Sequence, residues 1–141
     1  GIVSAGNGQD VLSLDIRYPV TADKEQICSG LREAAAPYQV IVTEAGHVEP
    51  LYIPKDTPLV STLMASYEAA AKKPCTLYST GGGTYARHCN NTVTGFGPIF
   101  PEQPGSNAHG PNEFIDLEYF RLHCRVCLEA LYRMFTGKTG E

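Results

Sequence analysis

The chain is organised around Gly105-Ser-Asn-Ala-His109-Gly-Pro-Asn-Glu113, a glycine- and proline-rich stretch directly before the clearest amphipathic helix of the sequence. Glycine and proline interrupt regular structure, so this stretch predicts a loop supported by the helix that follows. An imidazole on such a loop is well placed for a metal ligand, which makes His109 a candidate. A solvated histidine is the more ordinary interpretation, because spacing alone does not identify a ligand.

The helix after this loop is expected to begin at Asp116, a residue type that caps helix N-termini. Its apolar side chains recur at helical spacing and predict one buried stripe, which would make the helix a structural brace for the loop. The predicted stripe consists of Leu117, Phe120, Cys124, Cys127, Leu131 and Met134.

The composition indicates a single globular domain, because 141 residues with 43% apolar content are enough to form a core. The net charge of −4 comes with no basic run, which argues against nucleic acid or an anionic membrane as a partner. No apolar run approaches the roughly 20 residues that a bilayer requires, and no signal segment opens the chain. We therefore expect a soluble cytoplasmic protein.

The cysteines favour reduced thiols over a disulfide framework, because they are five in number and irregularly spaced. Cys124-Arg-Val-Cys127 has the C-x-x-C pattern of some metal sites. It lies within a helical pattern and has no second cysteine pair, so core packing is the expected role.

The first part of the chain predicts a small α/β unit. Two strands, residues 1–8 and 11–18, are expected to form a hairpin at Gly6-Asn7-Gly8, where glycine and asparagine accept positive φ angles. A helix capped by Thr21 follows. The β-branched run at residues 38–43 then predicts another strand, which gives a strand-helix-strand unit, half of an α/β sandwich.

In the second strand of this hairpin, alternation places three apolar side chains on one face, which is expected to be buried. These are Leu12, Leu14 and Ile16.

The second part of the chain starts near residue 50, because residues 46–55 have neither a helical nor a strand period. Thr57-Pro58 predicts a helix start by a cap and a first-turn proline, and the apolar pattern continues to Lys72. Residues 75–79 and 92–100 are expected to be short strands. The whole chain is thus expected to be a mixed α/β protein.

Gly81-Gly-Gly-Thr84-Tyr-Ala-Arg87 follows the first of these short strands and predicts a loop that leads into a helix. Such transitions present backbone N–H groups to an anion. A triple glycine is also common in a simple flexible turn, so the pattern does not decide between the two.

Three stretches together resemble a known family: Asp15-Ile-Arg17-Tyr-Pro19, Gly81-Gly-Gly-Thr84-Tyr-Ala-Arg87 and Ala108-His109-Gly-Pro-Asn-Glu113. In this order and spacing they are similar to the C-terminal portion of zinc metallopeptidases of the bacterial dipeptidase V type. Their superfamily also holds aminoacylase, carnosinase, carboxypeptidase G and succinyl-diaminopimelate desuccinylase. The resemblance covers nearly the whole chain.

The resemblance implies a catalytic α/β domain interrupted in sequence by a lid domain of ferredoxin-like topology. Residues 1–50 would be the end of the lid, and residues 51–141 the end of the catalytic domain. The chain would then be a fragment of a dipeptidase that uses two zinc ions, an expectation also suggested by a first residue that enters directly into a strand-like run.

The same resemblance implies a role for His109 as a zinc ligand. Imidazole nitrogen is a preferred donor for zinc, and Asn112 and Glu113 could steady the ring from behind. Those two residues could equally satisfy the loop's own polar groups.

It also implies that Arg17 grips the C-terminal carboxylate of a dipeptide, a task for which a planar fork of donors is suited. On spacing alone, a surface ion pair with a neighbouring carboxylate is the simpler interpretation of this arginine. Gly82, Gly83 and Thr84 would line the carboxylate end of the site, and Arg87 would add positive charge.

The catalytic residues of the family, further zinc ligands and a general base, have no match here. His47-Val-Glu49 is the nearest pair of histidine and carboxylate, but it lies in the segment between the two parts. We therefore expect no catalytic residue in this chain and no activity from it alone. Two alternatives stay open: a complete non-catalytic module that binds a carboxylated small molecule, and self-association as a homodimer or strand-swapped oligomer.

Overall fold

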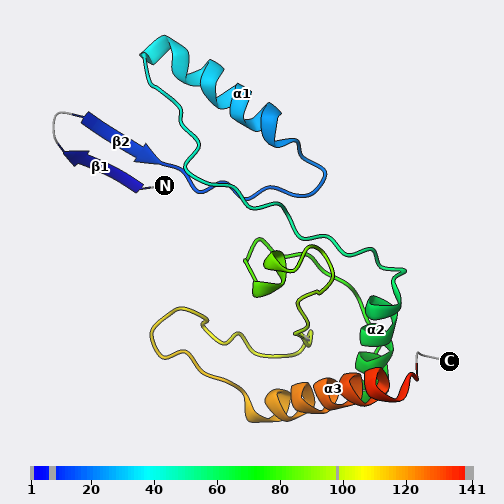
Figure 1. The fold of residues 1–141 in the computed structure, drawn as a ribbon. Helices are drawn as coiled ribbons and strands as arrows, with labels where there is room; N and C mark the ends of the chain where they lie inside the picture. The colour runs from blue at the N-terminus through cyan, green and yellow to red at the C-terminus, as the bar shows by residue number, and fades with distance from the viewer. Residues whose placement is uncertain (1, 7–8, 98, 139–141) are drawn as a thin grey trace. The chain divides into compact units, whose positions relative to one another are not determined.

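The computed structural model describes residues 2–6, 9–97 and 99–138, and its ribbon is drawn in Figure 1. The chain divides into two compact units, the first formed by Gly1–Tyr52 with Thr80–Gly83 and the second by Ile53–Ser79 with Thr84–Glu141. Over the described ranges the chain is mainly helical, with a single two-stranded sheet. No helix in these ranges is long and apolar enough to cross a membrane.

The first unit begins with the expected hairpin. Strand β1, Ile2–Gly6, pairs antiparallel with β2, Gln9–Ser13, and Ile2 lies opposite Ser13. The turn predicted at Asn7 and Gly8 lies outside the described residues. Strand β2 is shorter than predicted, because it ends at Ser13 and the chain up to Pro19 has no regular structure.

Helix α1, Lys24–Ala35, follows the hairpin and starts later than predicted. Asp23 is the cap in place of Thr21, and its carboxylate accepts a hydrogen bond from the Gln26 N–H at 3.1 Å. A short 3-10 helix, η1, continues over Ala36–Tyr38 and contains Pro37. Helix α1 buries none of its residues fully, so it does not cover a core.

The predicted strand at residues 38–43 is wrong, because this segment is irregular and the Ile41 side chain is 87% exposed. Residues 75–79 and the described part of residues 92–100 are not strands either. A two-stranded ribbon cannot bury side chains without another layer. The strand-helix-strand unit is therefore absent from the described part of the chain.

The prediction of a buried face on the second strand is wrong as well, because a two-stranded ribbon has no further layer to cover it. All three of its side chains are exposed: Leu12, Leu14 and Ile16.

The second unit is built on helix α2, Pro58–Ala71, which begins and ends where the sequence predicts. The Thr57 hydroxyl accepts a hydrogen bond from the Val60 N–H at 3.3 Å, and Lys72 ends the helix in a left-handed conformation. The fully buried Ser66 hydroxyl donates to the Thr62 carbonyl at 2.6 Å, so a small polar side chain is buried without an unsatisfied group.

Helix α3, Leu117–Thr136, is capped by Asp116, as predicted, and ends at Gly137 with a φ of 68°. The predicted buried stripe is wrong, however, since the buried residues of α3 are Val126 and Ala130. Leu117 and Val126 are nine residues apart, about two and a half turns, which places them on opposite sides of the helix. Helix α3 therefore has two apolar faces, and only one is covered in this unit.

The core of the second unit lies between α2 and α3, which pack against each other (Figure 1). Phe100 is 2% exposed and stacks on Tyr67, with ring centroids 5.8 Å apart. On its other side Phe100 meets the Tyr119 ring at 5.7 Å, and Val126 completes the cluster. One aromatic residue from a loop thus joins the two helices.

None of the five cysteines forms a disulfide, in agreement with the expectation of reduced thiols. Core packing is wrong for Cys124, whose side chain is exposed, whereas Cys127 is half-buried. Burial, followed by the nearby Cys124, raises the pKa of the Cys127 thiol. Neither cysteine belongs to the side of α3 that packs on α2.

Candidate functional site

Arg17 lies in the irregular segment after β2 and makes two contacts within the first unit. Its Nη1 donates to the carbonyl oxygen of Gly81 at 2.8 Å, and its Nη2 lies 3.2 Å from Oδ2 of Asp15. The side chain is 60% exposed. A guanidinium carries more N–H donors than these two contacts use, so further donors stay available for a carboxylate.

The glycine loop contributes a carbonyl oxygen to this arrangement, through Gly81. The neighbouring Gly82 N–H donates to the Thr80 hydroxyl at 3.1 Å, which forms a tight turn. A side chain at Gly81 would meet nothing within 4 Å, so the loop has open space around it. The structure thus brings Arg17 and the glycine loop together, although they are 64 residues apart in sequence.

Thr84 and Arg87 belong to the second unit, at the short 3-10 helix η2, Tyr85–His88. The Thr84 hydroxyl accepts a hydrogen bond from the Ala86 N–H at 3.1 Å and so caps η2. Arg87 is half-buried on this helix. The observed role of Thr84 is structural, and its hydroxyl hydrogen stays available to a ligand.

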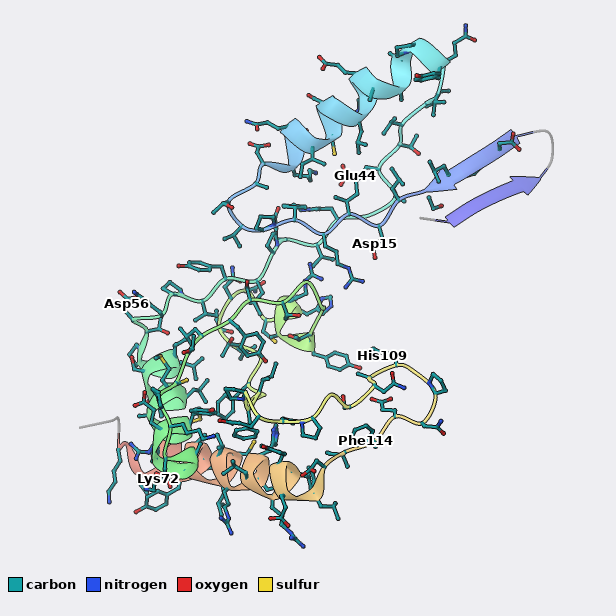
Figure 2. All side chains as sticks on the ribbon, turned by 180° about the vertical axis from the view of Figure 1, so that it is seen from behind. Asp15, Glu44, Asp56, Lys72, His109 and Phe114 are labelled. Carbon is teal, nitrogen blue, oxygen red and sulfur yellow. The ribbon has the colours of Figure 1, made fainter. Side chains whose placement is uncertain are left out.

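His109 is exposed on the long loop that precedes α3, as Figure 2 shows. The loop is closed by a hydrogen bond from the Phe114 N–H to the Ser106 carbonyl, at 3.1 Å. Inside it, Asn107 accepts from the Gly110 N–H at 2.9 Å and donates from Nδ2 to the Pro111 carbonyl at 2.5 Å. These bonds fix the loop and leave the imidazole at its surface.

The backbone of His109 has a φ of 63°, in the left-handed region that a residue with a side chain seldom adopts. Asn107 and Asn112 share this conformation, with φ of 52° and 57°, but asparagine tolerates it better. Such backbone strain is commonly found at functional positions. Gln39 and Lys72 have the same conformation where they end helices, so the assignment of His109 as a site residue stays a prediction.

Asn112 and Glu113, the predicted supports of His109, are both exposed. Within the described ranges neither residue forms a hydrogen bond with the His109 ring. Their assignment as supports stays a prediction.

A contact that the sequence did not predict joins Tyr18 to His47 in the first unit. The phenol oxygen lies 2.5 Å from Nε2 of His47, and the two rings are nearly parallel, with centroids 6.1 Å apart. Nδ1 of His47 lies 3.7 Å from Oε1 of Glu49. Partial burial, followed by the negative charge of Glu49, raises the pKa of the Tyr18 phenol. The only sequence signal was the His47-Val-Glu49 spacing, and nothing in it pointed to Tyr18.

Comparison with known proteins identifies the family. Residues 4–133 match the peptidase family M20/M25/M40, which is nearly the whole chain. The chain belongs to this peptidase family. The family resemblance inferred from the three sequence stretches is thereby confirmed.

Curated M20 relatives carry the names of dipeptidases. The chain is 37% identical over 123 residues to the putative dipeptidase YtjP of Bacillus subtilis (strain 168), which covers 87% of this chain and 26% of that protein. It is 33% identical over 129 residues to the Beta-Ala-Xaa dipeptidase of Lactobacillus delbrueckii subsp. lactis, covering 90% of this chain and 26% of the relative.

A putative dipeptidase of Staphylococcus haemolyticus (strain JCSC1435) is 29% identical over 136 residues, which cover 95% of this chain and 28% of the relative. The chain therefore spans about a quarter of the length of the curated relatives that it matches. No solved structure gives a significant match.

M20 peptidases are generally metal-dependent, so we tested whether the residues present fit a metal centre. Within the described ranges, no three His, Cys, Asp or Glu side chains lie close enough together to hold a metal ion. A zinc site requires about four donors, three of them from the protein when the site is catalytic. The chain by itself does not fit a metal centre, and His109 offers at most one donor.

Proposed function

We propose that the chain is the C-terminal part of an M20 dipeptidase, which hydrolyses the peptide bond of dipeptides, and that this part holds the substrate carboxylate. The proposal rests on the arrangement of Arg17, whose guanidinium contacts Gly81 and Asp15 while the side chain stays 60% exposed. Family membership and the names of the relatives support the reaction class.

The chemistry of Arg17 suits this role. A guanidinium binds a carboxylate through two parallel N–H···O bonds, which fixes the direction of the ligand as well as its charge. The contact with the Gly81 carbonyl limits the rotation of the side chain before a ligand arrives, so less conformational entropy is lost on binding. Gly82 and Gly83 would allow the ligand to approach the backbone. The resemblance to the family is the ground for assigning Thr84 and Arg87 to substrate binding as well.

We assign residues 1–50 to the end of a lid domain of ferredoxin-like topology and residues 51–141 to the end of the catalytic domain. The change of compact unit between Tyr52 and Ile53 supports a division near this place, although Thr80–Gly83 belong to the first unit as well. Five free cysteines support a cytoplasmic location, where thiols stay reduced.

We further assign His109 as one zinc ligand of the whole enzyme, with Asn112 and Glu113 as its supports. Its exposed ring and strained backbone support this assignment. The other ligands would come from outside these 141 residues, so the role derived for this chain is limited to substrate holding, and the chain alone is expected to be inactive.

The binding of a dipeptide to the purified chain tests the proposal. L-alanyl-L-alanine is titrated and followed by the Nε–Hε NMR signals of the arginines, with L-alanyl-L-alaninamide as a ligand that lacks the carboxylate. We expect the acid to shift the Arg17 signal and the amide to leave it unchanged.

Substitution then identifies the residue responsible. Arg17→Ala should abolish the difference in affinity between acid and amide, whereas Arg32→Ala, which removes the same charge from α1, should retain it. Equal binding of acid and amide by the unmodified chain would refute the role of Arg17.

A second candidate is a self-associating module without catalysis, and the uncovered apolar side chains favour it. Leu131 on α3 is 53% exposed and Phe135 is 88% exposed, which is unusual for large apolar residues of a complete fold. A homodimer through this face, or a strand-swapped oligomer through the hairpin, would cover such surface. Sedimentation measurements over a range of concentrations separate this candidate from a monomeric substrate-holding part.

A further inference from the structure

The segment that carries Arg17 has little support from its own backbone. Strand β2 ends at Ser13, and residues 14–18 take part in no backbone hydrogen bond within the described part of the chain. An arginine that fixes a ligand needs a backbone that stays in place. Side-chain contacts must therefore supply the support.

Tyr18, the next residue, makes such a contact. Its hydroxyl is 2.5 Å from Nε2 of His47, a residue that lies 29 positions later in the irregular segment after α1. The two rings are nearly parallel, with an angle of 7° between their planes, and the His47 side chain is only 22% exposed. The hydrogen bond thus joins the edges of two nearly parallel rings, one of which is largely buried.

Glu49 lies near Nδ1, the other ring nitrogen of His47, and influences which ring nitrogen carries the proton. A carboxylate can only accept, so its position 3.7 Å from Nδ1 favours the tautomer with the proton on that nitrogen. Nε2 is then the acceptor, and the Tyr18 hydroxyl donates to it. At 3.7 Å the Glu49 interaction is electrostatic and not a direct hydrogen bond.

We propose that Tyr18 and His47 are positioning residues for the Arg17 clamp. Tyr18 directly follows Arg17 in the chain, so a Tyr18 side chain held by His47 limits the movement of the backbone that carries Arg17 to the glycine loop. Loss of the Tyr18–His47 bond would let the segment move and would spread the orientations of the guanidinium. This inference rests on the proposed function of Arg17.

Tyr18→Phe tests it with the smallest change, because the ring stays while the hydroxyl is lost. We expect the affinity for L-alanyl-L-alanine to fall about three- to tenfold, the range that one hydrogen bond covers, with the amide unaffected. Tyr38→Phe is the matched control in the same unit, since Tyr38 is 78% exposed, and it should bind as the unmodified chain does. Unchanged affinity in Tyr18→Phe would overturn the inference.

Variants of His47 provide a second readout that a purely structural role would not change. His47→Gln keeps an acceptor near the hydroxyl and should retain most of the affinity, whereas His47→Leu should lose as much as Tyr18→Phe. The double variant Tyr18→Phe/His47→Leu should bind no more weakly than His47→Leu alone, because both changes remove the same bond. Additive losses would overturn the inference.

The preference for the acid over the amide, measured in Arg17→Ala and in Tyr18→Phe, separates failure of the inference from failure of the proposed function. If Arg17→Ala loses the preference for the acid and Tyr18→Phe does not weaken it, the clamp stands and its positioning by Tyr18 is refuted. If Arg17→Ala keeps the preference, the binding of the carboxylate by Arg17 is refuted. The positioning role of Tyr18 is then refuted as well.

Discussion

Arg17 donates a hydrogen bond of 2.8 Å from Nη1 to the carbonyl oxygen of Gly81. Its Nη2 donates a second one, of 3.2 Å, to Oδ2 of Asp15. Of the two partners, only Asp15 competes with a ligand for the positive charge. The Gly81 carbonyl orients the guanidinium without neutralising it. This difference leads to a first prediction.

Asp15→Asn should raise the affinity of the chain for L-alanyl-L-alanine by about two- to fivefold, because it removes a charge that competes with the ligand carboxylate. Stability should change by less than about 1 kcal/mol, since the ion pair is exposed. NMR titration at low and high salt checks both the gain and its screening. Asp10→Asn, which removes an exposed charge from β2, is the control, and a loss of affinity in Asp15→Asn would contradict the prediction.

Phe100→Ala should destabilise the second unit by about 3–5 kcal/mol, because it leaves a cavity between Tyr67 and Tyr119. Urea unfolding followed by near-UV circular dichroism measures the loss. Phe135→Ala removes the same side chain at a position that is 88% exposed and should change the free energy of unfolding little. Similar losses in the two variants would show that Phe100 is not the centre of the core.

Gly110→Ala should disturb the loop that presents His109. An added Cβ would lie 2.7 Å from Oδ1 of Asn107, so that side chain must move and give up its bond to the Pro111 carbonyl. We expect shifted NMR signals for the Asn107 amide and the His109 ring. Gly105→Ala is the control, because a Cβ there meets nothing within 4 Å. Equal effects of the two substitutions would argue against a fixed loop.

The isolated chain should not bind zinc tightly through His109, since within the described ranges no three His, Cys, Asp or Glu side chains lie close enough together to hold a metal ion. Titration calorimetry with zinc under reducing conditions should give the same result for the unmodified chain and for His109→Ala. Neither should hydrolyse L-alanyl-L-alanine. Stoichiometric zinc binding that His109→Ala abolishes would refute this expectation.

Leu131→Lys should weaken any self-association of the chain, because it places a charge on the uncovered apolar face of α3. Tyr132→Lys is a matched control on the same helix, at a residue that is 50% exposed and lies away from this face. Analytical ultracentrifugation measures the association constant of each variant. Equal constants for both variants would exclude this face as the contact.

Helix boundaries followed from local sequence, because the groups that end a helix lie next to it. Thr57 and Asp116 cap α2 and α3 as predicted, and Lys72 ends α2. The predicted cap Thr21 was wrong by two residues, since Asp23 offers its carboxylate to the first turn of α1. Such errors are small because the candidate capping residues lie within a few positions of one another in the sequence.

Strands could not be predicted in the same way, since a strand exists only with a partner. The β-branched run at residues 38–43 has the composition of a strand and no neighbour to pair with. The face of α3 was missed for a related reason. Its sequence has apolar residues on both sides, and only the packing of Phe100 and α2 selects the side of Val126.

The sequence by itself determined the family and the ends of α2 and α3, because each depends on short motifs. Tertiary structure alone decided that Arg17 contacts Gly81 and that Tyr18 meets His47, since these contacts join residues 64 and 29 positions apart. Contacts of this kind depend on the path of the whole backbone, which no local pattern of residues contains.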